Sequence, residues 1–587
     1  MTAARLVGGE DVMKQTGKTA GRILAAAGLT AVLLALAVPS VHAAPQQGDP
    51  RKNLRIGMTQ YPSTLHPLYD AMLAKSLVLG ATLRPMTAYT PDWQPACILC
   101  TELPSYANGR AEKITLPNGK TGIRARYTLK DDLFWADGTP VTSDDVLLAY
   151  DVGRHPQAGV SNHTFYAEDI VGIDKLDTKN FAITFARQTC EFASIDDVTP
   201  LPAHLERDVF EKDPATYQNR SLYVTAPTTK GLWMGPYRVA GVESGTALQL
   251  ARNDNWHGTP PAFDHLTFRV IENTSAMASS LLAGQIDYIA GELGLPLDQA
   301  IGFEKRLPAG QFSVTYKPGL TYEHIDLPTD KPPFNDIRLR QALMFAMNRD
   351  IISQKIYDGR QPVANANISP LDTVYNPDVK TYPYDPARAA ALFDDAGWHM
   401  GRDGLRRNDK GEVLRLTLST TAGNLSREVV QQVIQSDWRK AGVDVVIKNQ
   451  PPRVLFGETL RKRLFDGGVM YAWMASPRNI PKTTLHSSMI PTADNGYAGQ
   501  NSIAYNSTDA DKTIDDLSVV CDAKANRALW NHLQDLYARD LPALPLFFRA
   551  EGYFIPSWLS GITPTGHMHP STLRVEYWRI TPDKEQQ

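Results

Sequence analysis

The sequence lacks the features of several large functional classes. It has four cysteines in 587 residues, a formal net charge of −3, and one long apolar run, which lies near the N-terminus. A surface that binds nucleic acid needs a clustered excess of lysine and arginine, so this charge balance argues against nucleic acid as a partner. Because no second apolar run approaches the roughly 20 residues that span a bilayer, we expect the mature chain to be soluble.

Motifs of common enzyme families are also missing. The sequence has no G-x-S-x-G nucleophile elbow, no H-E-x-x-H zinc helix and no G-x-G-x-x-G dinucleotide loop. His567 and His569 could bind a metal, but two histidines so spaced in a terminal loop are usually solvated. We therefore expect no cofactor, no metal and no enzymatic activity, with a secreted hydrolase as a remote alternative.

Length and composition predict a globular protein of two to four domains. Its 43% hydrophobic and 21% charged residues are ordinary for that class. Residues 1–43 predict a signal peptide, because basic residues precede the apolar run Ile23–Val38 and the segment ends at Val41-His42-Ala43. The alternative is a membrane anchor, and translation could begin at Met1 or at Met13.

The four cysteines leave their pairing open. Cys97 and Cys100 have the spacing of a redox motif, but they lie in a proline-rich loop and not at the start of a helix. We interpret them as a small structural disulfide, with a redox centre as the alternative. Cys190 and Cys521 complete the set, and four cysteines allow three connectivities.

Strand and helix patterns alternate along the chain. Ile123–Lys130 alternates as a strand, and Thr142 or Ser143 is placed to cap a helix through Tyr150. Later, a strand, a helix and a strand follow one another, over Leu414–Leu418, Glu428–Ala441 and Val443–Ile447. That order predicts a parallel strand pair and an α/β arrangement.

Several segments together resemble a known family. They are YTLKDDLFWADGTPVTSDDVLLAYD at Tyr127–Asp151, GPYRV at Gly235–Val239, RNDNWHG at Arg252–Gly258, LTFRVIENTSAMASSLLAGQIDYI at Leu266–Ile289, and PPFNDIRLRQALMFAMNRDII at Pro332–Ile352. In the last of these we expect a turn followed by one amphipathic helix. The order of the segments is similar to that of the extracellular solute-binding proteins of the oligopeptide, dipeptide and nickel class, over essentially the whole mature chain.

The resemblance implies an α/β fold of the type II periplasmic binding protein kind. Two lobes would be joined by two hinge crossings, with an extra α/β domain inserted in the first lobe. The expected order is a signal peptide (1–43), lobe I (44–85), the inserted domain (86–230), lobe I (231–318), lobe II (319–543) and lobe I (544–587). We place the crossings near Ser313–Asp326 and Leu541–Phe548.

The resemblance also implies the function. A periplasmic, monomeric binding protein would capture peptides or amino-acid conjugates by lobe closure and deliver them to an ABC permease with its ATPase subunits. A nickel-chelate or opine-type receptor is the alternative, since the family includes nickel-binding members.

Candidate ligand-binding residues follow from the family's contact segments. The second-lobe stretch GVMYAWMASPR supplies Trp473, Ala475, Ser476 and Arg478. Peptide-binding relatives often carry an acid three positions after this tryptophan, and here Ser476 takes that place. An unpaired buried ammonium is costly, so we expect an anionic group on the ligand to bind Arg478, with pairing to a protein carboxylate as the alternative.

Two loops supply weaker candidates. Tyr61, Ser63 and Thr64 follow the first strand, where hydroxyl groups could bind a ligand or form turns. A glycine-rich loop carries Asn495, Tyr497, Gln500 and Asn501, which could face the cleft or belong to the surface.

Overall fold

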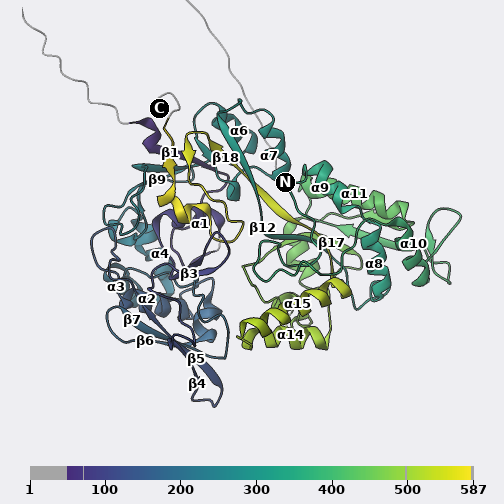
Figure 1. Cartoon of the computed structure of the whole chain (residues 1–587), viewed down its shortest axis with the longest axis horizontal. Coiled ribbons are helices and arrows are strands. Elements are labelled where there is room, and N and C mark those ends of the chain that lie inside the picture. The colour runs from purple at the N-terminus through teal and green to yellow at the C-terminus, as the bar shows by residue number, and fades with distance from the viewer. Residues whose placement is uncertain (1–48, 71, 496, 498, 583–587) are drawn as a thin grey trace, which may run out of the picture. The chain divides into compact units, whose positions relative to one another are not determined.

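A ten-stranded sheet runs through the computed structural model (Figure 1), which describes residues 49–582 except 71, 496 and 498. The strand order is β16-β15-β17-β12-β18-β11-β1-β10-β9-β8. The bounds are β1 Asn53–Met58, β8 Tyr237–Glu243, β9 Ala247–Arg252, β10 His265–Val270, β11 Tyr288–Ile289, β12 Phe312–Asp326, β15 Arg415–Ser419, β16 Asp444–Ile447, β17 Gly468–Met474 and β18 Ala543–Pro556. The predicted signal peptide lies outside the described residues.

The two longest strands, β12 and β18, lie side by side at the centre of this sheet (Figure 1). They pair antiparallel from Phe312 opposite Pro556 to Asp326 opposite Ala543, with a register shift between Pro318 and Tyr322. The two segments predicted as crossings fall largely within these strands. We call residues 327–542, which lie between them in sequence, region B, and residues 49–311 with 557–582 region A.

Region A contains a separate four-stranded sheet in the order β4-β5-β7-β6. The remaining strands of the chain are β2 Thr87–Tyr89, β3 Pro95–Cys97, β4 Ala111–Thr115, β5 Thr121–Thr128, β6 Ile170–Lys175, β7 Asn180–Phe185, β13 His399–Met400, β14 Arg406–Arg407, β19 Leu559–Ser560 and β20 Arg579–Ile580. The four-stranded sheet falls inside the predicted inserted domain, whose bounds stay a prediction.

Helices fall between these strands, singly or several in succession. Their bounds are α1 Leu73–Thr82, α2 Ser143–Arg154, α3 Ala203–Lys212, α4 Tyr217–Arg220, α5 Leu222–Thr225, α6 Thr274–Leu282, α7 Leu297–Glu304, α8 Ile337–Phe345, α9 Arg349–Ile356, α10 Pro386–Asp395, α11 Leu425–Lys440, α12 Pro452–Val454, α13 Lys482–Leu485, α14 Thr508–Val519 and α15 Ala523–Asp540. Within the described residues, none of these helices has the length and apolarity of a membrane span.

Local sequence explains where several helices begin. Thr142 caps α2, and the carboxylate of Asp145 accepts a hydrogen bond from the Thr142 backbone N–H, which completes a reciprocal capping box. The predicted strand–helix–strand unit is confirmed as β15, α11 and β16, with β15 and β16 parallel. The single helix predicted within Pro332–Ile352 is wrong, because the chain ends α8 at Phe345 and starts α9 with Asn348 as its cap.

Both disulfides are formed in the structure. Cys97 pairs with Cys100, as interpreted from sequence, and Cys190 pairs with Cys521, so the open connectivity is settled. No cysteine in the described chain is free. The second disulfide joins region A to region B.

Candidate functional site

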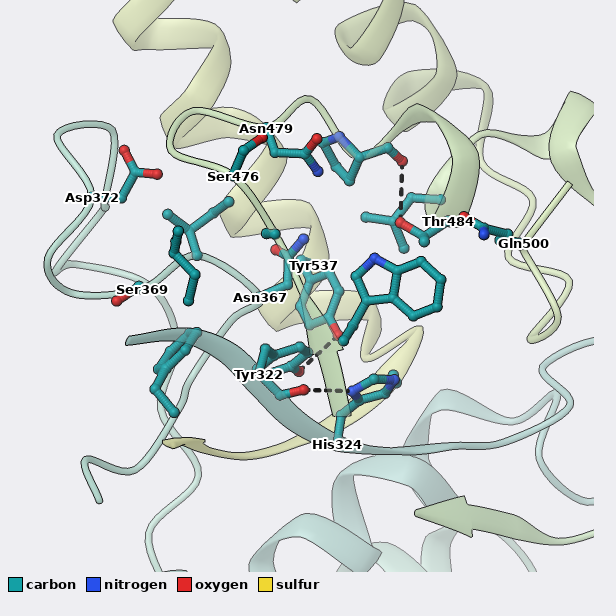
Figure 2. A pocket seen from close by; sticks show the side chains of 18 of the residues that line it. Tyr322, His324, Asn367, Ser369, Asp372, Ser476, Asn479, Thr484, Gln500 and Tyr537 are labelled. Carbon is teal, nitrogen blue, oxygen red and sulfur yellow. Dashed lines mark hydrogen bonds between the residues drawn. The ribbon is translucent and has the colours of Figure 1, made fainter. Parts of the chain in front are cut away.

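The first cavity lies within region B, beside the central strands (Figure 2). Its empty volume is about 760 Å³. Aromatic and polar side chains share its lining, which includes Tyr322, His324, Asp326, Asn367, Ser369, Asp372, Tyr471, Trp473, Ala475, Ser476, Asn479, Thr484, Gln500 and Tyr537. This mixture suits a ligand that presents both apolar groups and hydrogen-bonding groups.

Strand register brings the aromatic side chains of this cavity together. Tyr322 of β12 lies opposite Trp473 of β17, and His324 lies opposite Tyr471. Alternate residues of a strand point to the same face, and directly opposed residues on neighbouring strands share a face. The imidazole of His324 stacks on the ring of Tyr322, with 4.9 Å between centroids and 7° between planes.

A buried hydrogen-bond network holds the base of the cavity. Asp326 accepts a hydrogen bond of 2.8 Å from the Tyr471 hydroxyl, and its other oxygen lies 3.3 Å from Nε2 of His324. Nδ1 of His324 lies 3.2 Å from the carbonyl oxygen of Tyr322. The network leaves His324 with contacts on both ring nitrogens and therefore fixes the orientation of its ring.

The tyrosines of the base remain neutral hydrogen-bonding groups. Burial raises the pKa of Tyr322 and Tyr471 well above the ordinary value, and nearby Tyr537 and Asp326 respectively add to the shift. The Tyr322 and Tyr537 hydroxyls lie 2.9 Å apart (Figure 2), which links β12 to α15. Amide and hydroxyl groups around this base come from loops at Asn367, Ser369, Asn479 and Gln500 and from α13 at Thr484 (Figure 2).

A second cavity lies between the two regions. Its empty volume is about 1340 Å³, and its lining includes Tyr89, Asp169, Arg187, Cys190, Glu191, Asp196, Asp197 and Met568 of region A with Ser476, Arg478, Asn479, Leu517, Asn526 and Trp530 of region B. Ser476 and Asn479 line both cavities. The two cavities therefore adjoin along the segment that follows β17.

Carboxylates dominate the charges of the second cavity. Asp169 pairs with Arg187 at 2.9 Å, and Nε2 of His569 lies 4.0 Å from a carboxylate oxygen of Asp196. Burial raises the pKa of Glu191, Asp196 and Asp197, and for Asp197, where the charge of Asp196 adds to the effect, the pKa is about 6. Raised acid pKa values mean that these carboxylates gain from a cation placed between them.

Arg478 enters this cavity from region B. Its backbone N–H donates a hydrogen bond of 2.7 Å to Asp372, and its φ of 55° places it in the left-handed region. Burial raises the pKa of Asp372, while the Arg478 backbone hydrogen bond and charge act in the opposite direction. Burial raises the pKa of Glu191, and the positive charges of Arg187 and Arg478 offset part of that rise.

The structure brings together five of the eleven residues predicted from sequence. Trp473, Ala475, Ser476 and Gln500 line the first cavity, and Arg478 lines the second. The other six, Tyr61, Ser63, Thr64, Asn495, Tyr497 and Asn501, line neither of these two cavities. Their roles as ligand contacts stay predictions.

The turn contacts of those residues are visible. The Ser63 hydroxyl donates to Asp70, and Oγ1 of Thr64 accepts from the backbone of His66 at 3.1 Å. The Asn495 side chain accepts from the backbone of Thr492 at 2.9 Å.

Two groups of residues were not predicted from sequence. They are the aromatic base of the first cavity, formed by Tyr322, His324 and Tyr471, and the acidic wall of the second, formed by Glu191, Asp196 and Asp197. His324 lies within a segment predicted as a crossing, and no local pattern connects it with residues some 150 positions later. The run Cys190–Asp197 contains three acids, and that density next to a cysteine was the one available signal.

Comparison with known proteins identifies the class. Residues 118–491, more than half of the chain, match the profile of "Bacterial extracellular solute-binding proteins, family 5 Middle". The chain therefore belongs to this family of extracellular solute-binding proteins. Its predicted family and its type II periplasmic binding protein fold are both confirmed.

Individual relatives are similar over most of their length. The oligopeptide-binding protein AppA of Bacillus subtilis is 25% identical over 452 residues, which cover 75% of this chain and 78% of the relative. The nickel-binding periplasmic protein of Escherichia coli is 25% identical over 447 residues, covering 73% and 78%. The oligopeptide binding protein of Thermus thermophilus, solved with a pentapeptide, is 25% identical with a TM-score of 0.67 and covers 91% of this chain and 98% of its own.

Proposed function

We propose that this protein is the periplasmic substrate-binding component of an ABC importer and that it captures peptides or related amino-acid conjugates without altering them. The observation that carries the proposal is the cavity between regions A and B, because a ligand held there contacts both regions at once. Such a ligand stabilises the closed state over the open one by the contacts that only closure completes. The monomer would then dock on a permease driven by ATPase subunits.

A peptide fits the chemistry of the two adjoining cavities. The second cavity offers Glu191, Asp196 and Asp197 to an ammonium group, although Ser476 replaces the acid that many peptide-binding relatives carry. Arg478 offers a guanidinium to a carboxylate. The first cavity offers Trp473 to a side chain, and amides such as Asn479 to a peptide backbone.

Calorimetric titration tests the proposal. The mature protein, freed of ligand by unfolding and refolding, is titrated with trilysine, pentaalanine, and nickel with free histidine. We expect heat from at least one of the peptides, with no new product by mass spectrometry after incubation. Binding of nickel–histidine alone would replace the proposal with the nickel-chelate alternative, and accumulation of cleaved peptide would replace it with the hydrolase.

A further inference from the structure

The disulfide between Cys190 and Cys521 joins the two regions at the edge of the second cavity. Cys190 follows β7 in region A and lines the cavity, whereas Cys521 lies in the turn between α14 and α15 in region B. The two residues are 331 positions apart in sequence, and their Cα atoms are 5.2 Å apart. The chain itself passes between the regions only in β12 and β18, so this bond is a third covalent connection.

Two hydrogen bonds extend the contact on either side of the disulfide. The backbone N–H of Cys190 donates to the carbonyl oxygen of Ser518 at 3.0 Å. Nε2 of Gln188 donates to the carbonyl oxygen of Val519 at 2.7 Å. The segment 188–190 is therefore fixed on the end of α14, and the disulfide lies in an interface that the backbone also forms.

A disulfide limits how far this edge of the cavity can open. The Cα atoms of bonded cysteines stay within about 6.8 Å of each other. From 5.2 Å, the two walls can separate here by no more than about 2 Å while the bond is intact. A hinge rotation about β12 and β18 that parts the two regions at this edge is consequently blocked in the oxidised protein.

We propose that the Cys190–Cys521 disulfide is a tether that restricts opening of the binding cavity, so that the oxidised protein exchanges ligand more slowly than the reduced one. The statement about ligand exchange rests on the proposed function, whereas the restriction on opening stands on the geometry alone. Both cysteines are half-buried, so a small dithiol reaches the bond, whereas Cys100 of the other disulfide is fully buried.

Release of the tether is a two-electron reduction. A dithiol thiolate attacks one Sγ atom, and the Sγ–Sγ bond breaks to leave a mixed disulfide with the reductant. The second thiolate of the reductant then attacks the reductant's own sulfur in that mixed disulfide and displaces the cysteine Sγ. Cys190 and Cys521 each end as a thiol after taking up a proton, and the dithiol ends as its own disulfide. No other bond in region A or region B has to change.

Hydrogen exchange and X-ray scattering test the tether without any ligand. Mature protein from an oxidising compartment is compared with the double variant Cys190→Ser/Cys521→Ser and with the native protein reduced by dithiothreitol. We expect amide exchange in segments 186–197 and 515–527 to rise about tenfold or more in both. We also expect the radius of gyration to increase. The matched control, Cys97→Ser/Cys100→Ser, removes a disulfide that lies wholly in region A. It should leave amide exchange in those two segments and the radius of gyration of the protein unchanged.

Two results would overturn the tether. One is alkylation of both Cys190 and Cys521 in the unreduced protein. The other is equal exchange and scattering for the oxidised protein and both untethered forms. The dissociation rate of trilysine, followed in the same samples, then tests the effect on ligand exchange. A protein that shows the tether but binds no peptide in any form contradicts the proposed function and leaves the tether intact.

Discussion

The carboxylate of Glu323 lies 2.6 Å from the guanidinium of Arg549, and this pair joins the two central strands β12 and β18. A second guanidinium, that of Arg427 on α11, lies 2.5 Å from the other carboxylate oxygen. The Glu323 side chain is only 2% exposed. One buried acid thus links both crossing strands to a helix of region B.

Removing this acid is expected to destabilise the protein strongly. Glu323→Gln leaves the largely buried guanidinium of Arg427 and the partly exposed guanidinium of Arg549 without their counter-charge, and we expect a loss of about 3 kcal/mol in the free energy of unfolding. Urea denaturation followed by circular dichroism measures the loss. The matched control is Arg415→Gln, which breaks an exposed pair with Asp444 and should cost less than about 1 kcal/mol. Equal losses in the two variants would contradict the role of Glu323.

The same acid predicts a dependence of stability on pH. Burial alone would raise the pKa of Glu323, but the charges and hydrogen bonds of Arg549 and Arg427 lower it below the ordinary value of 4.5. A lowered folded-state pKa gives stability that is complete above the unfolded-state value and is lost as the pH falls through the folded-state value. Wild-type stability should therefore fall below about pH 4.5 more steeply than that of Glu323→Gln, as measured by melting between pH 3 and 7.

Trp473 is expected to contribute to peptide affinity. Trp473→Ala removes a large aromatic surface from the first cavity, and we expect affinity for a bound peptide to fall about 30-fold, as for an aromatic group at the centre of an interface. Isothermal titration measures the change. Leu464→Ala serves as the control, because this side chain is 66% exposed and lines neither cavity described above. An unchanged affinity in Trp473→Ala would place the peptide elsewhere.

The acidic wall predicts that cationic ligands bind more weakly in acid. Burial, with the charge of Asp196, raises the pKa of Asp197 to about 6. Above that pH the carboxylate is charged and attracts an ammonium group, whereas below it the group is neutral. We expect the affinity for trilysine to fall about tenfold between pH 7.5 and 5, a change of ~1.4 kcal/mol in binding free energy.

Two comparisons separate this effect from a general loss of fold. Asp197→Asn should bind trilysine more weakly at pH 7.5 and should flatten the pH dependence. N-acetylated pentaalanine, which carries no cation, should bind equally at both values. A pH dependence of trilysine binding that Asp197→Asn leaves unaltered would assign the effect to another group.

Arg478 is expected to bind the anionic group of a ligand. Arg478→Gln should lower the affinity for a peptide with a free C-terminal carboxylate by about tenfold, the effect of losing one charge-assisted hydrogen bond. The same peptide with a C-terminal amide should lose much less, and this comparison is measured by titration of both ligands into both proteins. Equal losses for the two ligands would indicate that Arg478 supports the loop through Asp372 instead.

Local chemistry explains which parts of the fold were predictable. The cap at Thr142 and the order β15, α11, β16 depend on neighbours in sequence, so short patterns were sufficient. The break between α8 and α9 was missed because the apolar spacing continues through Ala346 and Met347, and only Asn348 marks the new start. Capping by one asparagine is a weaker signal than a glycine or proline would be.

The candidate site was predictable only where one segment supplies it. Trp473, Ala475, Ser476 and Arg478 are consecutive or nearly so, and they follow a single strand. The aromatic base instead depends on the register between β12 and β17, and a shift of one residue would turn His324 to the opposite face. Register is set by long-range pairing, which no short pattern in this sequence encodes.

The pairing of Asp326 with Ala543 has a practical consequence for engineering. These residues are the last of β12 and the first of β18, and they lie opposite each other in the sheet, where paired Cα atoms are about 5 Å apart. The segment 327–542 leaves β12 at Asp326 and enters β18 at the paired residue Ala543. Grafting the corresponding span from a relative would therefore transplant one wall of the cavity with two backbone junctions to splice, provided that the graft keeps a cysteine in place of Cys521 to bond Cys190.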